Sequence, residues 1–208
     1  MATTQTNPCE ALDLYESLNY CTGDTVLPGL RKTAYAVSKR QVSKFASLPE
    51  LAAKLQMDKI SVLEGQFELF ADVVAIRIDL LDTASNITSA SQGEKPSKTF
   101  LNTLTIKYPG NNEAATGFCR LANADDMIFF VQQRDGKWRV LGNKMFDTNI
   151  NPSQESGMAV TDASGTTLDI TSTDLCPAPF YKGLLHTADG WLNCDTDEIT
   201  EEKPAAGG

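Results

Sequence analysis

The feature that most constrains the fold is the dipeptide Asp135-Gly136, which separates two strand-like runs, 127–134 (MIFFVQQR) and 137–141 (KWRVL). Asp-Gly between such runs is a strong hairpin signal, because both residues tolerate the positive φ of a two-residue type I′ turn. The sequence therefore predicts a hairpin with Arg134 opposite Lys137 as its closing pair.

This register places apolar pairs on both faces of the hairpin. Val131 lies opposite Val140, and Phe130 lies opposite Leu141. A strand pair that is apolar on both faces must be covered on both sides. One face is expected to form the core of a sandwich, and the other needs a helix or another subunit.

Two further strands are predicted upstream, where apolar and polar residues alternate over 76–80 and 100–108. The polar tract 82–98 between them is interpreted as a long, mobile loop rich in serine and threonine. A loop of this length inside a compact domain is usually functional or disordered.

Two short helices are also predicted. Residues 47–50 (SLPE) match a capping box, and apolar residues then recur at helical spacing to Leu55. The break at 109–112 (PGNN) supplies the N-cap of a second helix. Gly117 within it costs about 1 kcal/mol relative to alanine, which indicates close packing against a sheet or a distorted turn. The apolar face of this helix is expected to comprise Ala114, Phe118, Leu121 and Ala122.

Further turns and strands are predicted in the second half of the chain. Residues 142–157 are turn-rich, and a second hairpin is predicted from 158–161 and 166–173 around the turn at 162–165 (DASG). The sheet is expected to end near 176–179 (CPAP), because proline cannot donate to a ladder of strand hydrogen bonds.

A chain of 208 residues is expected to form one domain. We divide it into an N-terminal arm (1–30), a single β-sandwich domain (31–195) with the long loop at 82–98, and a flexible acidic tail (196–208). The arm either lies on its own domain or reaches a neighbour. The predicted fold class is mainly β, a sandwich or barrel with one or two short flanking helices.

The chain has 27 acidic and 18 basic residues, a formal net charge of −9 and a pI near 4.6. This charge argues against a protein that grips phosphate backbones. The charge is also segregated, since basic residues gather in 31–54 and acidic residues in 189–203. The pattern suits either subunits that meet through complementary patches or two separately solvated faces.

No stretch approaches the roughly 18 consecutive apolar residues that span a bilayer, and the first residues lack a basic region followed by an apolar one. Neither a membrane partner nor export is expected. The cysteines show no CxxC spacing, which is typical of thiols in a reducing compartment. They are Cys9, Cys21, Cys119, Cys176 and Cys194.

The residues that could carry chemistry form no recognisable site. His186 is the only histidine and no GxSxG motif accompanies it. Asp125 and Asp126 are adjacent acids, which more often cap a helix end than form a glycosidase pair. Residues 195–198 (DTDE) lack the spacing of a calcium loop, and phosphate-loop motifs are absent. We therefore expect no catalytic residue, no metal site, no cofactor and no enzymatic activity.

Three segments of the second half resemble structural proteins of tailed bacteriophages, in particular tail tube proteins of phages that infect gut Bacteroides-type bacteria. These segments are 125–149 (DDMIFFVQQRDGKWRVLGNKMFDTN), 156–173 (SGMAVTDASGTTLDITST) and 177–183 (PAPFYKG). The resemblance implies a tail-tube-like sandwich or barrel with a flanking helix. It also implies that six copies close into a ring and that rings stack so that β-strands line a channel for the genome. The 82–98 loop would resemble the extended hairpin that joins one ring to the next in that family.

The same resemblance implies the partners and the location. The partners are further copies of the chain, other virion proteins, and genome DNA that passes without tight binding. The location is the virion, after synthesis in the cytoplasm of the bacterial host. An acidic protein suits such a channel, because it repels phosphates.

Other functions stay open. Residues 1–30 and 31–54 are more than a plain tube subunit needs, so a head-tail connector, a tail ring or a capsid decoration protein is an alternative. A monomeric β-sandwich binding module is another, with Trp138 and Trp191 as its large aromatic anchors. An enzyme of unrecognised type using Asp125 or Asp126 is the third. A ring-former hides its strand edges between copies, whereas a monomer blunts them with charges or prolines.

Overall fold

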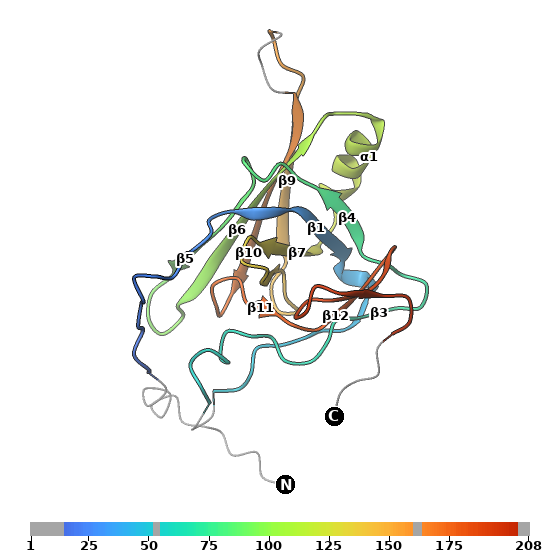
Figure 1. The fold of residues 1–208 in the computed structure, drawn as a ribbon. Coiled ribbons are helices and arrows are strands. Elements are labelled where there is room, and N and C mark those ends of the chain that lie inside the picture. The colour runs from blue at the N-terminus through green and yellow to red at the C-terminus, as the bar shows by residue number, and fades with distance from the viewer. Residues whose placement is uncertain (1–14, 52–54, 160–163, 204–208) are drawn as a thin grey trace.

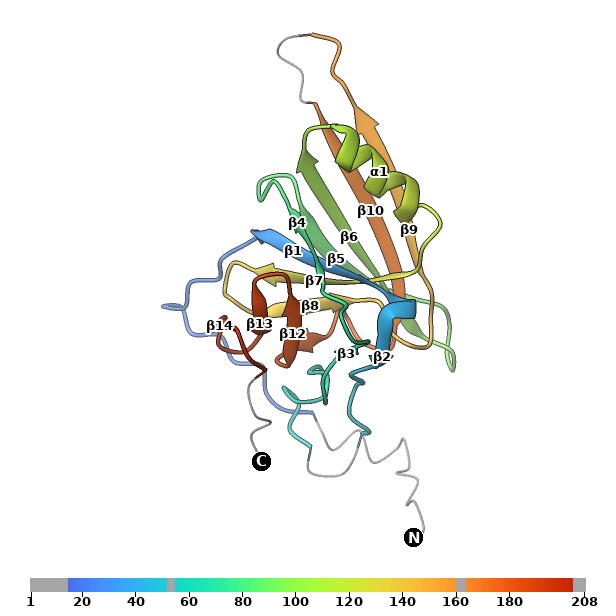
Figure 2. The same cartoon turned by 90° about the vertical axis from the view of Figure 1, so that its right-hand side faces the viewer.

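The computed structural model describes residues 15–51, 55–159 and 164–203, and within these it is mainly β with one α-helix (Figures 1 and 2). Its largest sheet has five antiparallel strands in the order β11-β8-β7-β1-β4. These strands are β1 (Leu30–Ser38), β4 (Ile76–Asp79), β7 (Met127–Gln133), β8 (Trp138–Leu141) and β11 (Phe180–Tyr181).

A four-stranded sheet in the order β5-β6-β10-β9 packs against one face of the five-stranded sheet. Its strands are β5 (Asn86–Gln92), β6 (Thr99–Pro109), β9 (Thr148–Glu155) and β10 (Gly165–Asp174). The prediction of a mainly-β sandwich with a flanking helix is confirmed.

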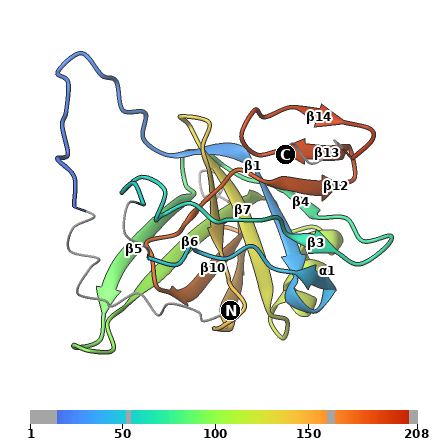
Figure 3. The same ribbon diagram turned by 90° about the horizontal axis from the view of Figure 1, so that it is seen from below.

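Shorter elements cover the opposite face of the five-stranded sheet (Figure 3). They are β2 (Val42–Lys44), β3 (Glu68–Leu69), β12 (Leu184–Thr187), β13 (Gly190–Asn193) and β14 (Ile199–Thr200). The short 3-10 helix η2 (Lys39–Gln41) joins β1 to β2, and α1 (Glu113–Ala122) joins β6 to β7.

The core between the two large sheets is built from the inward side chains of both. β7 contributes Phe129 and Val131, and the four-stranded sheet contributes residues such as Leu104, Ile106 and Ile170, all of them fully buried. Ala122, at the end of α1, closes one end of this core. These side chains come from strands far apart in the sequence, so the core forms only when both sheets are in place.

A second core lies on the other face of the five-stranded sheet. Phe67 makes edge contacts with Phe130 at 5.1 Å and with Tyr181 at 5.3 Å between ring centroids. The Tyr181 hydroxyl donates to the Leu184 carbonyl at 2.8 Å and accepts from the Phe67 amide at 3.1 Å, so its buried polar end is satisfied. The chain's own loops and short strands therefore cover this face, and the prediction that a helix or another subunit does so is wrong.

The central hairpin forms with a different turn from the predicted one. Phe130 pairs with Val140, and the Gly136 amide donates to the Gln133 carbonyl at 3.0 Å. With Gly136 at φ +91°, this is a three-residue turn ending in a left-handed glycine, instead of a two-residue type I′ turn. The register is therefore shifted by one residue. The shift is tolerated because β7 is apolar on both faces, so either register buries it.

The helix predicted after residues 109–112 is confirmed, and the one predicted at 47–55 is wrong for the described residues. Asn112 caps α1 by accepting a hydrogen bond from the Ala115 amide at 2.9 Å. Gly117 faces open space and Leu121 is 74% exposed, so neither packs against a sheet. Residues 48–51 form no helix, while 52–54 lie outside the described residues.

Three other expectations are corrected. The predicted loop at 82–98 contains strand β5, which forms a hairpin with β6. The turn-rich stretch 142–157 contains strand β9, and it is β9 that pairs with β10; residues 158–159 form no strand and 160–163 lie outside the described residues. The acidic tail predicted at 196–208 includes β14, which pairs with β13.

Phe129→Ala should lower the free energy of unfolding by about 3–5 kcal/mol, because it removes a fully buried ring from the main core. Urea unfolding followed by circular dichroism measures this change. Leu121→Ala is the control, and an exposed side chain there predicts a change within about 0.5 kcal/mol. Equal losses in the two variants would contradict the described packing.

Candidate functional site

The four-stranded sheet turns a flat polar face away from the core. Register places threonines side by side across it: Thr88 lies opposite Thr103, which lies opposite Thr171, which lies opposite Asn149. Its ionisable members are Lys107, Asp169 and Glu155; the others are Asn86, Thr88, Ala90, Gln92, Thr99, Leu101, Thr103, Thr105, Asn149, Asn151, Ser153, Thr167, Thr171 and Thr173. We call this surface the threonine face.

Side chains on the threonine face bond to one another across the strands. Gln92 Nε2 donates to Thr99 Oγ1 at 3.2 Å and to Thr173 Oγ1 at 3.1 Å. Thr105 Oγ1 donates to Asp169 Oδ1 at 2.8 Å. Cross-strand hydrogen bonds of this kind hold the side chains close to the sheet. The face therefore offers a mostly polar surface with few charges.

One edge of this sheet, β9, is blunted. Pro152 has no amide to donate, and the Thr148 amide is already bonded to Asp126 Oδ1 at 2.9 Å. Helix α1 packs beside β9, where Thr116 Oγ1 donates to Gln154 Oε1 at 3.1 Å. These are the devices that prevent an edge strand from pairing with another chain.

The other edge, β5, is open. The sheet ends at this strand, and its sequence NITSASQ contains no proline and no charged residue. The Lys107 amide and carbonyl both point to the β5 side, because they bond to Ser85 Oγ at 3.0 Å and to the Leu81 amide at 2.7 Å. By alternation along the ladder, the amides of Ile87, Ser89 and Ser91 then point outward.

An open, uncharged edge of this length is a template for another strand. The sequence reading missed it, because β5 has no apolar alternation and was interpreted as part of a loop. The signal that could have found it is the run of serine and threonine residues with Ile87, since threonine and isoleucine favour strands. The strands predicted at 100–108 and 127–141 lie in the interior of their sheets, so they provide no free edge.

A cluster of charges links η2 to the segments that lead into β7 and β9. Lys39 Nζ lies 2.8 Å from Asp126 Oδ2 and 3.2 Å from Asp147 Oδ1. Burial lowers the pKa of Lys39. Its hydrogen bonds to these two carboxylates raise the pKa by more, so the pKa of Lys39 is raised overall. The hydrogen bond from Lys39 lowers the pKa of Asp147. The Asp147 contribution to stability is therefore present above the pKa of a free aspartate and is lost as the pH falls into the acid range.

The segregated charges pair within the chain. Arg31 of the basic segment bonds to Asp197 of the acidic segment at 2.8 Å. Arg40 lies 3.2 Å from Asp125, and Lys44 lies 3.2 Å from Glu68. The Arg31–Asp197 and Lys44–Glu68 pairs are exposed on both sides and contribute little to stability, whereas Asp125 is mostly buried beside the exposed Arg40.

The other residues considered for chemistry have structural surroundings. His186 Nδ1 lies 3.0 Å from the Val73 carbonyl, and its ring stacks on Trp191 at 4.5 Å. Asp125 accepts hydrogen bonds from the Ser38 hydroxyl and the Asp126 amide. Within the described ranges, no group of three histidine, cysteine or acidic residues could hold a metal ion, and no helix is long and apolar enough to cross a membrane.

The described cysteines are unpaired and only Cys21 is fully exposed, while Cys9 lies outside the described residues. Burial raises the pKa of the Cys176 thiol to about 11 and raises that of Cys194 further. Both thiols are therefore protonated at neutral pH, and the protonated form is a poor nucleophile.

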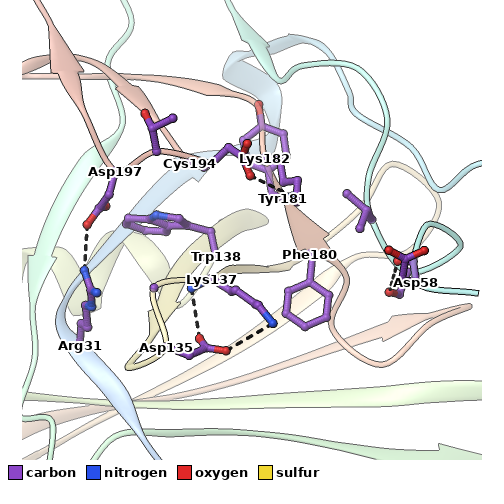
Figure 4. A pocket seen from close by; sticks show the side chains of 15 residues that line it. Arg31, Asp58, Asp135, Lys137, Trp138, Phe180, Tyr181, Lys182, Cys194 and Asp197 are labelled. Atoms are coloured by element: carbon purple, nitrogen blue, oxygen red, sulfur yellow. Dashed lines mark hydrogen bonds and ion pairs between the residues drawn. The ribbon is translucent and has the colours of Figure 1, made fainter. Parts of the chain in front are cut away.

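A pocket of about 610 Å³ lies between the central hairpin turn, β11 and the turn after β13 (Figure 4). Each cation that lines it has a carboxylate partner: Arg31 with Asp197, Lys137 with Asp135, and Lys182 with Asp195. Trp138 Nε1 is buried in its wall without a hydrogen-bond partner among the described residues. Because each lining cation is paired with a carboxylate, the described lining of the pocket has no free positive charge with which to bind an anion.

Comparison with known proteins gives no relatives. No family model, no curated protein and no solved structure matches this chain. Functional inference therefore depends on the surfaces described above.

Asp126→Ala should lower the free energy of unfolding by about 1–3 kcal/mol, because the Thr148 amide and Lys39 both lose a partner. Asp147→Ala is the matched control, since it removes only the exposed second partner of Lys39, and its effect should be smaller. Urea unfolding at pH 7 compares them. An equal or larger loss in the Asp147 variant would contradict the role given to Asp126.

Proposed function

We propose that this chain is a virion structural protein of a tailed bacteriophage, and specifically a tail tube subunit whose copies associate into rings. The observation that carries the proposal is the open β5 edge on a sheet whose other edge is blunted. A protein that works as a monomer is expected to blunt both edges. A subunit that joins its neighbours needs an edge that stays available.

The two edges of this sheet differ, so β5 of one copy can meet either a second β5 or a different surface of the next copy. β5 and β9 are the two edge strands of the four-stranded sheet and lie on opposite sides of it (Figure 2). A contact between one flank of a copy and the other flank of the next is heterologous, and repeated heterologous contacts close into rings or continue as filaments. We propose six copies, following the resemblance to tail tube proteins.

The threonine face supports a role as a channel lining. It has no aromatic side chain on which a base could stack and only one cation, Lys107, to bind phosphates. The net charge of −9 adds repulsion around it. DNA is proposed to pass along this face without tight binding. Other virion proteins are the further proposed partners, and the proposed location is the virion, after synthesis in the host cytoplasm.

A projecting hairpin supports stacking of the rings. β9 and β10 extend beyond the body of the sandwich, next to α1 (Figures 1 and 2). The tract 82–98, for which this stacking role was expected, forms the hairpin of β5 with β6, and we propose its β5 edge for the contact within a ring. We therefore assign the proposed ring-to-ring contact to the β9–β10 hairpin. A connector, a tail ring or a decoration protein would use the same open edge.

Ser89→Pro should abolish self-association, because it removes an outward amide at the centre of the β5 edge. Ser89→Ala, the control, keeps that amide and should assemble like the parent. Negative-stain electron microscopy and solution mass over a range of concentrations measure both. Circular dichroism and urea unfolding establish that the proline variant is folded.

A parent protein that stays monomeric at all concentrations would count against the proposed function. A proline variant that forms rings as readily as the alanine variant would show that the β5 edge takes no part.

A further inference from the structure

The described part of the N-terminal arm, residues 15–29, forms no helix or strand and exposes many apolar side chains. Five large ones are 52% to 89% exposed: Tyr15, Leu18, Tyr20, Val26 and Leu27. Elsewhere in the described molecule such side chains are mostly buried. Exposed apolar side chains gathered in one short segment are typical of an interaction site.

Within the arm, residues 17–21 (SLNYC) have the pattern of a strand with one apolar side. They carry no charge, and Leu18 and Tyr20 alternate with Asn19 and Cys21. In an extended conformation, the two apolar side chains therefore lie on one side of the segment and the two smaller ones lie on the other. An extended segment of this kind can add to the open edge of a sheet.

The arm is scarcely attached to its own domain. From residue 15 to residue 28, its one hydrogen bond to the rest of the described chain is from the Met57 amide to Glu16 Oε1, at 3.4 Å. Its other hydrogen bonds are internal, from the Asp24 amide to the Cys21 carbonyl and from the Tyr20 hydroxyl to the Asp24 carbonyl. The arm therefore makes no hydrogen bond to β5 of its own molecule, and the amides of residues 17–21 are free.

The open β5 edge is a matching acceptor. In the described chain, no hydrogen bond reaches the outward amides of Ile87, Ser89 and Ser91. The side chains of these residues lie on the core side of the sheet, where Ile87 packs against the main core while Ser89 and Ser91 are exposed. The core side of β5 is therefore uncovered beyond Ile87. An added strand can place apolar side chains there, next to Ile87.

The link between this segment and the domain is long enough to reach another copy. The arm is anchored at Gly29, whose carbonyl accepts a hydrogen bond from the Arg134 amide at 3.2 Å. From Cys21 to Gly29 an extended chain spans at most about 26–29 Å. The radius of gyration expected for a domain of this size is only about 16 Å. Residues 17–21 can therefore lie outside their own domain, on the β5 edge of a neighbour.

We propose that residues 17–21 of one copy add as a strand to the β5 edge of a second copy. Leu18 and Tyr20 then lie on the core side next to Ile87, while Asn19 and Cys21 lie on the side of the threonine face. The contact rests on the proposed self-assembly and names the surface that meets β5. Because donor and acceptor are different segments, each copy can give one arm and receive another, so the contact repeats from copy to copy.

A complementation experiment tests this contact. Leu18→Asp/Tyr20→Asp disables the arm, and Ser89→Pro disables the β5 edge. Each variant alone should associate at least about tenfold more weakly than the parent, because the first replaces buried apolar surface by charge and the second removes an outward amide. A one-to-one mixture should restore a two-copy complex, since the intact arm of the proline variant meets the intact edge of the aspartate variant. Analytical ultracentrifugation of the separate and mixed proteins measures this.

Asn19→Asp/Cys21→Asp is the matched control, because it adds the same charge to the same segment on the side that faces away from the core. It should associate like the parent. If the parent and the arm-disabled variant assemble equally well while Ser89→Pro abolishes assembly, the arm contact is wrong and the proposed function stands. A mixture that restores no complex also overturns the arm contact. A parent that never associates overturns both.

Crosslinking gives a second readout that does not need the proline variant. Cys21 is exposed, and Ala90 is exposed on the threonine-face side of β5, where the proposal places Cys21. In a Cys9→Ser background, Thr88→Cys or Ala90→Cys should form a disulfide with Cys21 of another copy under oxidised glutathione. Thr171→Cys is the control, because it lies on the same face two strands from β5, and it should form none.

Non-reducing electrophoresis should show crosslinked copies, and adding Cys21→Ser should remove them. A disulfide that forms within a single chain would show that the arm docks on its own β5 edge, and it overturns the contact between copies. Crosslinks that persist without Cys21, or none at all in assembled protein, overturn it as well.

Discussion

Strand β7 is apolar on both faces, and the rest of the fold is arranged to cover it. Phe129 and Val131 face the four-stranded sheet, while Ile128 and Phe130 face the loops and short strands on the other side. Because both covers come from this chain, the five-stranded sheet needs no partner to bury its faces. What the fold leaves exposed to other molecules is its edges, the threonine face and the arm.

Those exposed features are distributed unevenly, so the two flanks of the molecule differ. One flank has the open β5 edge, and the other has α1 and the blunted β9 edge (Figure 2). Asp126 and Pro152 keep β9 from pairing. A repeated contact between two different flanks is heterologous and builds rings or filaments.

Sequence patterning predicted the central buried strand and α1, but it missed the register of the central hairpin and the strands at the sheet edges. The apolar run at 127–131 and the cap at Asn112 predicted β7 and α1, because burial and capping leave local signals. The tract 86–92 was interpreted as a loop, because a strand with one face and one edge in water needs no apolar alternation. Pro152 also hid β9, since proline is tolerated only in an edge strand, and edge position depends on the whole fold.

The direct test of the account is backbone hydrogen exchange at β5, compared between dilute and assembled protein. Exchange rates report whether an amide is hydrogen-bonded and shielded from water. The account predicts that the outward amides of Ile87, Ser89 and Ser91 exchange rapidly in the monomer and become protected on assembly. If they exchange as rapidly in assembled protein as in the monomer, β5 is not the edge through which copies join, and the central claim is wrong.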